Sequence, residues 1–487
     1  MKIVVVGGGT SGLLSALALE KKGHDVVVLE KDKVGGLCRS EYIDGYTVDI
    51  GIHAITMLND GPLIRLLKKY SRYLPNFRPY GDYYIRTDKL YNIPVSMQEW
   101  TTTPVVPNKD KILITTKIID LMTSGFSKET SVYDIIKDMN LSKTSIDFFN
   151  TICYFLSGED AKKTPLWRLF TGAGYIPEDD ILPFIYKDLK INPLKTVLFK
   201  KFSRNKIMDI LNAGFLSSIK SGSKKYINKF INKNRYWTQG YPLGGVQSIC
   251  NCILYSLTKT DIRNEEVKRI IETSSETNSN SNDNSNNNSN NNNNHKNGYI
   301  VETDKNSYYA DIVIYSAPSR YLPDIAQIPE IQKNKKDFKN IKFTKSLTVW
   351  IGHEENPFPY MGSEVWIDYP CWATCTSNYD KSLAPNGKHL LGFSFTNTKK
   401  EEVLNIIENK LGLNLNKADM IHFQEAIPEQ ASCAVNQFFV YPKVKDNFYV
   451  VGTDADPRSM GITRAAYSVE VMLSELDNTF NKNNKNK

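Results

Sequence analysis

The stretch Lys2-Ile3-Val4-Val5-Val6-Gly7-Gly8-Gly9-Thr10-Ser11-Gly12 decides the fold of this chain. Its first part, Ile3 to Val6, is a β-branched run without polar residues, which is typical of a central parallel strand buried on both faces. Leu13 to Lys22 then carries apolar residues at helical spacing and ends at Gly23. Asp25 to Leu29 repeats the buried-strand pattern. Together these segments predict a β-α-β unit that ends at Glu30.

Three glycines in this unit have the spacing of a dinucleotide-binding turn. Gly7 permits a tight turn, Gly9 lets the backbone approach a pyrophosphate, and Gly12 lets the helix pack closely on the strand. The free N–H groups at the start of the helix favour phosphate, and Glu30 is placed to accept hydrogen bonds from ribose hydroxyls. The predicted cofactor-binding residues of this unit are Gly7, Gly9, Thr10, Ser11, Gly12, Glu30 and Lys31.

The loop after this unit, Val34-Gly35-Gly36-Leu37-Cys38-Arg39-Ser40, resembles a loop of the flavin amine oxidase superfamily. That superfamily includes protoporphyrinogen oxidases and phytoene-type desaturases. Gly35, Gly36 and Arg39 match its pattern. The resemblance implies that the cofactor is FAD, that this loop passes the FAD diphosphate, and that the arginine lies close to the cofactor.

The resemblance continues along the chain. Tyr241 to Val246 resembles the glycine-rich turn that precedes a helix in the family, and Val267 matches the position whose backbone meets adenine. Ala310 to Ile314 with Pro318 matches a strand motif, and Leu383 to His389 resembles a segment of the desaturase branch.

Near the C-terminus, Gly452 and Asp454, followed by Gly461 and Ile462, resemble the closing element of the family. The resemblance implies that Asp454 bonds the ribityl or phosphate region of FAD. It also implies that the last helix directs its N-terminus at the isoalloxazine ring, where a helix dipole stabilises negative charge on reduced flavin. Thr453 separates the glycine and the acid that the family keeps adjacent, and Val469 replaces a later glycine.

Two residues are candidates for a catalytic role. His53 follows a strand and a glycine turn that the family places near the flavin, and an imidazole can bond a flavin edge or shuttle protons. Tyr441, which precedes Pro442, is a candidate aromatic wall over the ring. A structural histidine and a core aromatic are the alternatives for the two positions.

These features predict an FAD-dependent oxidoreductase in which an organic donor passes a hydride to flavin N5. The expected partners are a small-molecule substrate, bulky and apolar, and molecular oxygen or another electron acceptor. Two segments, Tyr46 to His53 and Lys89 to Pro94, are similar to segments of UDP-galactopyranose mutases. In those enzymes reduced FAD performs a rearrangement without net redox change, so this resemblance implies an alternative function. A catalytically degenerate FAD-binding protein is the third alternative.

The predicted fold class is α/β, with a Rossmann-like FAD-binding domain and an inserted mixed α+β substrate domain. Residues 278–297 are rich in Asn and Ser and predict a disordered insertion, since they offer too little apolar surface to offset the entropy of ordering. The FAD-binding segments are 1–61, 236–340 and 426–480, the substrate-domain segments are 62–235 and 341–425, and 481–487 is a polar tail.

Composition limits the partners and the compartment. The 61 basic and 53 acidic residues are interspersed, which gives no indication of nucleic-acid binding. Seven cysteines, an odd number without zinc-site spacing, favour a reducing compartment and no metal site. Met1 runs directly into Ile3 to Val6, so we expect no signal sequence and a cytoplasmic protein.

The stretch 187–235 is rich in lysine and nearly free of acidic residues. Within it, Phe215 to Ile231 has the pattern of a basic amphipathic helix. Such a helix suits peripheral contact with an anionic membrane surface or with a phosphorylated substrate, and a solvated basic face is the alternative.

Overall fold

The predicted β-α-β unit lies at the centre of a six-stranded sheet in the computed structural model, which describes residues 1–51, 53–94, 97–172, 239–273, 298–396 and 398–485. β1 pairs in parallel with β2 on one side and with β14 on the other, so that Val4 faces both Val27 and Val313. Only the edge strand β21 is antiparallel. In spatial order the strands are β10 (Asp261–Asn264), β2 (Asp25–Glu30), β1 (Lys2–Val6), β14 (Ile312–Tyr315), β22 (Phe448–Val450) and β21 (Lys443–Lys445).

Both faces of β1 are buried, as the apolar run predicts. Ile3 and Val5 pack in one core with four helices, whereas Val4 and Val6 pack in another core with a second sheet. The four helices are α1 (Thr10–Lys21), α2 (Pro62–Tyr70), α12 (Gln247–Leu254) and α17 (Gly461–Lys485). The second sheet contains, in order, β13 (Ser307–Ala310), β12 (Gly298–Thr303), β11 (Val267–Thr273) and β15 (Ala326–Gln327). The predicted α/β class with a Rossmann-like domain is therefore confirmed.

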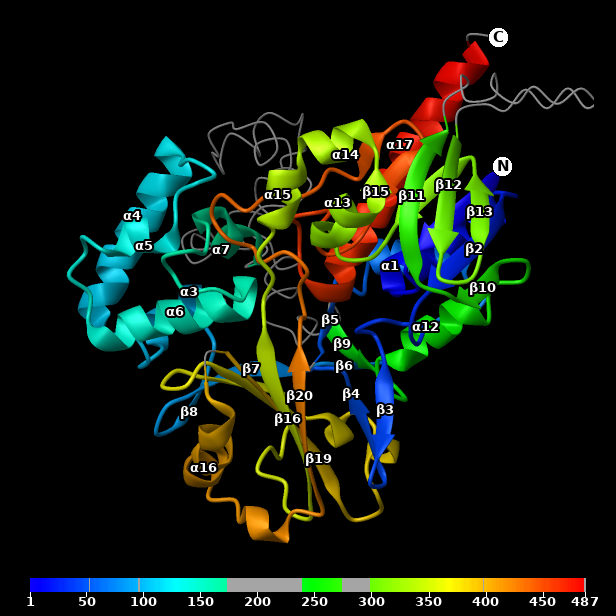
Figure 1. Cartoon of the computed structure of the whole chain (residues 1–487). Coiled ribbons are helices and arrows are strands. Elements are labelled where there is room, and N and C mark those ends of the chain that lie inside the picture. Colours follow the sequence, from blue (N-terminus) through cyan, green and yellow to red (C-terminus); the bar gives the residue numbers. More distant parts are fainter. Residues whose placement is uncertain (52, 95–96, 173–238, 274–297, 397, 486–487) are drawn as a thin grey trace, which may run out of the picture.

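The six-stranded sheet, the four-stranded sheet and the helices packed on them form the Rossmann half of the molecule. The second half consists of a seven-stranded sheet and a separate group of helices (Figure 1). The sheet is antiparallel except where β17 runs parallel to β7. Its strands are, in order, β20 (Met420–Ala426), β16 (Ser346–His353), β19 (His389–Phe395), β18 (Cys371–Cys375), β17 (Gly362–Trp366), β7 (Asp82–Arg86) and β8 (Leu90–Asn92). The helices of the group are α3 (Met97–Thr102), α4 (Asn108–Ser124), α5 (Val132–Ile136), α6 (Lys143–Ser157) and α7 (Leu166–Gly172).

Short elements connect the two halves. Two small sheets are formed by β3 (Ser40–Ile43) with β4 (Tyr46–Asp49), and by β5 (Ile55–Thr56), β9 (Gln239–Pro242) and β6 (Phe77–Pro79). In the part of the chain that the structure describes, the remaining helices are α13 (Leu322–Ile325), α14 (Pro329–Lys333), α15 (Lys335–Lys339) and α16 (Lys400–Leu411), with the 3₁₀ turns η2 (Ser319–Tyr321), η3 (Thr376–Asn378), η4 (Lys381–Leu383) and η5 (Leu415–Lys417). Among the described residues, no helix is long and apolar enough to cross a membrane.

Asp49 is a buried polar residue that joins these parts. Its carboxylate accepts hydrogen bonds from the hydroxyl of Tyr241 at 2.6 Å and from the backbone N–H of Val246 at 3.0 Å. Its carbonyl accepts the indole N–H of Trp350, on the seven-stranded sheet, at 3.0 Å. Because Asp49 is 1% exposed, burial raises the pKa of its carboxyl, although Tyr241 and Val246 act in the opposite direction. The loop before His53 is therefore fixed to both halves of the molecule.

Two predicted boundaries differ in the structure. The boundary at residue 61 moves beyond α2, because Leu63, Leu66 and Leu67 bury their side chains in the Rossmann core. The predicted polar tail begins at residue 481, but α17 continues to Lys485, so residues 481–485 belong to this helix. Phe480 supports this extension by packing against His24, with ring centroids 5.9 Å apart. The predicted insertion 278–297 and the basic stretch 187–235 lie outside the described residues.

Glu20 generates a prediction about stability. Its side chain is buried at the end of α1 and accepts hydrogen bonds from the N–H groups of Thr258, Lys259 and Thr260 and from both threonine hydroxyls, at 2.8–3.1 Å. Burial raises the pKa of this carboxyl, but the donors outweigh burial and hold the pKa well below its ordinary value.

We expect Glu20→Gln to lower the free energy of unfolding at pH 7 by about 3 kcal/mol, because an amide leaves buried donors without an acceptor. A lowered pKa stabilises the fold above the pKa of the unfolded chain, about 4.3, and that stability is lost as the pH falls. Urea denaturation at pH 7 and pH 4 should therefore give a smaller difference between wild type and variant at pH 4. Glu302→Gln, at a half-exposed surface ion pair, is the control and should change stability little. A difference that grows on acidification would contradict this account.

Candidate functional site

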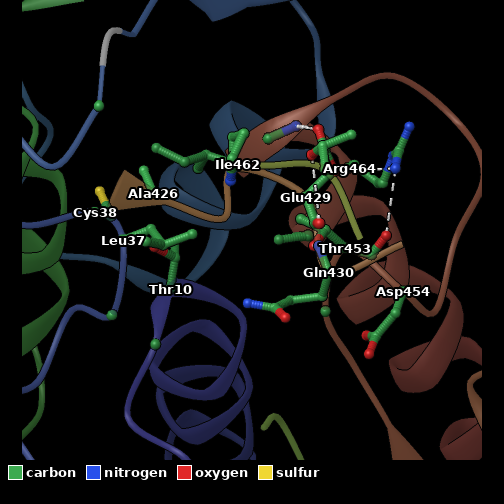
Figure 2. A pocket seen from close by; sticks show the side chains of 18 of the residues that line it. Thr10, Leu37, Cys38, Ala426, Glu429, Gln430, Thr453, Asp454, Ile462 and Arg464 are labelled. Atoms are coloured by element: carbon green, nitrogen blue, oxygen red, sulfur yellow. Dashed lines mark hydrogen bonds and ion pairs between the residues drawn. The ribbon is translucent and has the colours of Figure 1, made fainter. Parts of the chain in front are cut away.

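One cavity of about 770 Å³ lies between the Rossmann half and the second half of the molecule. Figure 2 shows Thr10 and Leu37 on one side of it and Glu429 and Arg464 on another. Thirteen of the predicted site residues line it, and they come from segments far apart in the sequence. These are Gly7, Gly9, Thr10, Ser11, Glu30, Lys31, Gly36, His53, Val267, Gly452, Asp454, Gly461 and Ile462.

The glycine turn forms one end of the cavity. Gly7 has a φ of +101°, a conformation that favours glycine, and its N–H donates to the carbonyl of Leu29 at 2.8 Å. A Cβ at Gly9 would meet no protein atom within 4 Å, so this position opens into the cavity. Gly12 does not line the cavity. It faces the backbone of the turn instead, and a Cβ there would lie 2.0 Å from the carbonyl oxygen of Gly7. Gly9 thus admits a ligand to the backbone, and Gly12 allows the close crossing of helix and strand.

Glu30 ends β2 beside this turn. Its carboxylate accepts the N–H of Gly8 at 2.7 Å and that of Asp32 at 2.9 Å, which holds it at the edge of the glycine turn. Lys31, which follows the end of β2, and Val267, the first residue of β11, line the same region of the cavity. A carboxylate next to a turn that offers N–H groups is the arrangement that binds the ribose and phosphates of a dinucleotide.

The loop after β2 differs in part from expectation. Gly36 lines the cavity, and Gly35 supports it from behind by donating its N–H to the carbonyl of Gly8 at 2.8 Å. Arg39 does not line the cavity. Its guanidinium donates to the carboxylate of Asp32 at 3.1 Å and to the carbonyl of Lys33 at 3.3 Å. Since these acceptors lie within the loop itself, Arg39 braces the loop.

The C-terminal element contributes the opposite wall. Asp454 is 1% exposed and accepts the N–H of Ser319 at 2.7 Å, so it fixes the turn that follows β14. Burial raises the pKa of its carboxyl, although the donors from Ser319 act against this. Gly461 begins α17, whose N-terminus faces the cavity, and Ile462 lies beside it.

The two catalytic candidates differ in position. His53 lines the cavity, and its Nε2 lies 2.8 Å from the carbonyl oxygen of Ile50. Because a carbonyl only accepts hydrogen bonds, Nε2 carries the proton and Nδ1 is the basic nitrogen. Tyr441 does not line the cavity: the residue is 44% exposed, and its hydroxyl donates to Glu475 of α17 at 2.9 Å.

Several cavity residues were missed from the sequence. Tyr154 and Phe155 come from the end of α6, and Trp372 comes from β18, so the second half supplies an aromatic wall. Glu429 and Arg464 form a buried ion pair at 3.0 Å. One signal for the pair was available, since Arg464 is a charged residue among Ile462, Ala465 and Ala466 at the apolar start of a helix. Among the described residues, no group of three or more His, Cys, Asp or Glu side chains is arranged to hold a metal ion.

Comparison with known proteins agrees with this picture. Residues 5–70 match the family model of the NAD(P)-binding Rossmann-like domain. An uncharacterized protein in the nifH2 3' region of Methanothermococcus thermolithotrophicus is 85% identical over 102 residues, which are 21% of this chain and all of that protein. A 4,4'-diapophytoene desaturase (4,4'-diaponeurosporene-forming) of Staphylococcus aureus is 34% identical over 105 residues, and this chain matches only 21% of its length.

Solved structures resemble nearly the whole chain. An oxidoreductase from Methanosarcina mazei has a TM-score of 0.67 at 17% identity, covering 97% of this chain and 100% of its own. Cyclohexylamine oxidase from Brevibacterium oxydans has a TM-score of 0.60 at 14% identity, covering 98% and 99%. Reduced UDP-galactopyranose mutase has a TM-score of 0.63 at 14% identity, covering 98% and 95%. At these identities the likeness shows the fold alone.

The chain therefore belongs to one family with the Methanothermococcus protein, and its overall fold is that of the solved oxidoreductase and amine oxidase structures.

Proposed function

We propose that this protein is an FAD-dependent oxidoreductase that accepts a hydride from an organic donor. The observation that carries the proposal is the continuity of the cavity. It runs from the glycine turn and Glu30, past Gly36, to the N-terminus of α17 and the aromatic wall of the second half. A cavity that extends this far past the glycine turn suits a dinucleotide with a large second ring system, such as FAD. The ring system would then meet a substrate at the aromatic wall.

The residues present fit FAD. Gly9 leaves room for the pyrophosphate against the start of α1, and Glu30 would bond the adenosine ribose next to Val267. The start of α17 would lie at the flavin end, where its N–H groups and dipole favour negative charge. Bound FAD would supply a two-electron acceptor, and the protein would supply orientation and exclusion of water.

The apolar wall favours a bulky, apolar substrate. Phe155 and Trp372 meet edge to face, with centroids 5.6 Å apart, and Leu156 and Val365 extend the same surface. This surface would hold a donor carbon against the cofactor through burial of apolar area. His53, with its basic Nδ1, is the candidate to hold a proton during the reaction. Molecular oxygen or another acceptor would then take the electrons.

A mutase is the second candidate. The fold likeness to reduced UDP-galactopyranose mutase and the similarity of Tyr46 to His53 favour it, and His53 lies in the cavity. Against it, Lys89 to Pro94, the second similar segment, supplies no residue to the cavity wall.

Two glycine variants test FAD binding. We expect Gly9→Ala to weaken FAD binding about tenfold or more, ~1.4 kcal/mol, because the added methyl group projects into the cavity. Its apo form should keep wild-type thermal stability, since φ is −70° and the Cβ meets no protein atom. Gly12→Ala is the matched control and should mainly lose stability, because its Cβ collides with Gly7. Flavin fluorescence titration and calorimetric melting measure both effects, and equal FAD affinity in wild type and Gly9→Ala would contradict the proposed site.

The type of reaction is tested by anaerobic titration of the FAD-loaded protein with amines, porphyrinogens and polyenes. We expect one of these donors to bleach the oxidised flavin spectrum by itself. Turnover of a UDP-sugar only after chemical reduction, with no net electron transfer, would favour the mutase. Bound FAD that no donor reduces and that supports no turnover would indicate a degenerate binding protein and contradict the proposal.

A further inference from the structure

Glu429 places a buried carboxyl at the N-terminus of α17, inside the cavity. The residue is 8% exposed and lies on the segment that leads from β20 back to the Rossmann half. One carboxylate oxygen accepts the N–H of Gly461, the first residue of α17. The other lies 3.0 Å from Nη1 of Arg464, one turn further along the helix. Figure 2 shows Glu429 and Arg464 side by side at the cavity wall.

Arg464 cannot move away from this carboxyl without losing other bonds. It is 1% exposed, and its guanidinium donates to the carbonyl oxygens of Ser459 at 3.0 Å and Ala431 at 2.9 Å. Removing a buried guanidinium from such acceptors is costly. The positive charge of Arg464 is therefore fixed beside Glu429. A change in net charge of this pair would come from protonation or deprotonation of the Glu429 carboxyl.

The charged groups around Glu429 come from three elements. Burial raises the pKa of its carboxyl, Arg464 and the N–H of Gly461 lower it, Arg168 of α7 lowers it, and Asp454 after β22 raises it. The outcome is a pKa above the ordinary value. This carboxyl is thus easier to protonate than an exposed glutamate, and its position lets it respond to charge in the cavity.

The ring end of the cofactor would lie close to this residue. Gly9, Glu30 and Val267 occupy the end of the cavity suited to phosphate, ribose and adenine, which leaves the end near α17 for the flavin ring. Hydride transfer adds two electrons and one proton to the ring, so that it gains one negative charge. An ionised Glu429 would repel that charge across a cavity wall of low dielectric.

We propose that Glu429 takes up one proton from solvent when the bound flavin is reduced and releases it when the flavin is reoxidised. This role rests on the FAD proposal above. Proton uptake neutralises the carboxylate, which compensates the charge gained by the ring. Arg464 positions the carboxyl and, by favouring its ionised form, allows the proton to leave again.

The test measures the flavin midpoint potential as a function of pH in the full-length, FAD-loaded protein. Under the proposal, the pKa of Glu429 is higher when the flavin is reduced than when it is oxidised. At pH values between these two pKa values, reduction of the flavin is accompanied by proton uptake at Glu429. In this pH range the midpoint potential of wild type should therefore fall more steeply with pH. We expect Glu429→Gln to remove this contribution, about 30 mV per pH unit for one proton per two electrons. Glu470→Gln is the control, since Glu470 lies on the same helix and pairs with Arg65 outside the cavity. It should follow wild type.

Identical slopes for wild type and Glu429→Gln over the whole pH range would overturn the inference. Flavin absorbance is measured first, and failure of wild type to bind FAD would instead reject the proposed function. If Glu429→Gln does not bind FAD, redox-difference infrared spectra of wild type and Glu429→Asp replace it. A neutral-acid C=O band that appears on reduction and shifts in the aspartate variant supports the proposal, and its absence overturns it.

Discussion

The close crossing of β1 and α1 is the constraint on which the rest of the structure depends. The carbonyl of Gly7 and the backbone of Gly12 approach so closely that a single methyl group at Gly12 would not fit. This contact brings the start of α1 directly above the carboxyl end of β1, so that the free N–H groups of the helix face the cavity. A wider crossing would turn those groups away from the ligand and separate Glu30 from the turn.

The cavity is completed by residues that the chain supplies much later. Gly452, Asp454 and the first turn of α17 reach it through β22, which pairs with β14 next to β1. The second half closes it with the end of α6 and with β18. Asp49 holds the halves together, because its side chain and its carbonyl bond residues of both. Since no single segment forms the site, binding should require the folded whole.

Much of the Rossmann half could be predicted from the sequence, because its signals are local. A buried strand, a glycine turn and a helix follow one another within a few residues, and Gly7, Gly9 and Glu30 lie where that pattern placed them. Arg39 matches a family pattern as well, but the local pull of Asp32 on its guanidinium is not visible in a motif. The position of the Tyr441 side chain could not be predicted for a different reason, because its partner Glu475 comes from α17.

The wall facing the cofactor could not be predicted, because it depends on contacts between distant segments. Phe155 and Trp372 are 217 positions apart and meet only when α6 packs beside the seven-stranded sheet. Glu429 has no local signal either, since it acquires its role from Gly461 and Arg464. The apolar face of α2 packs in the core of β1 and α1, and the sequence of this helix alone does not reveal which core it enters.

The central claim is that the continuous cavity is built for FAD, although the matched family model describes an NAD(P)-binding domain. The most direct test is a calorimetric titration of the full-length apo chain with FAD and, separately, with NAD. The account predicts one FAD site per chain and no comparable binding of NAD, because the cavity extends past the glycine turn to α17 and the aromatic wall. Tight binding of NAD with no binding of FAD would contradict it.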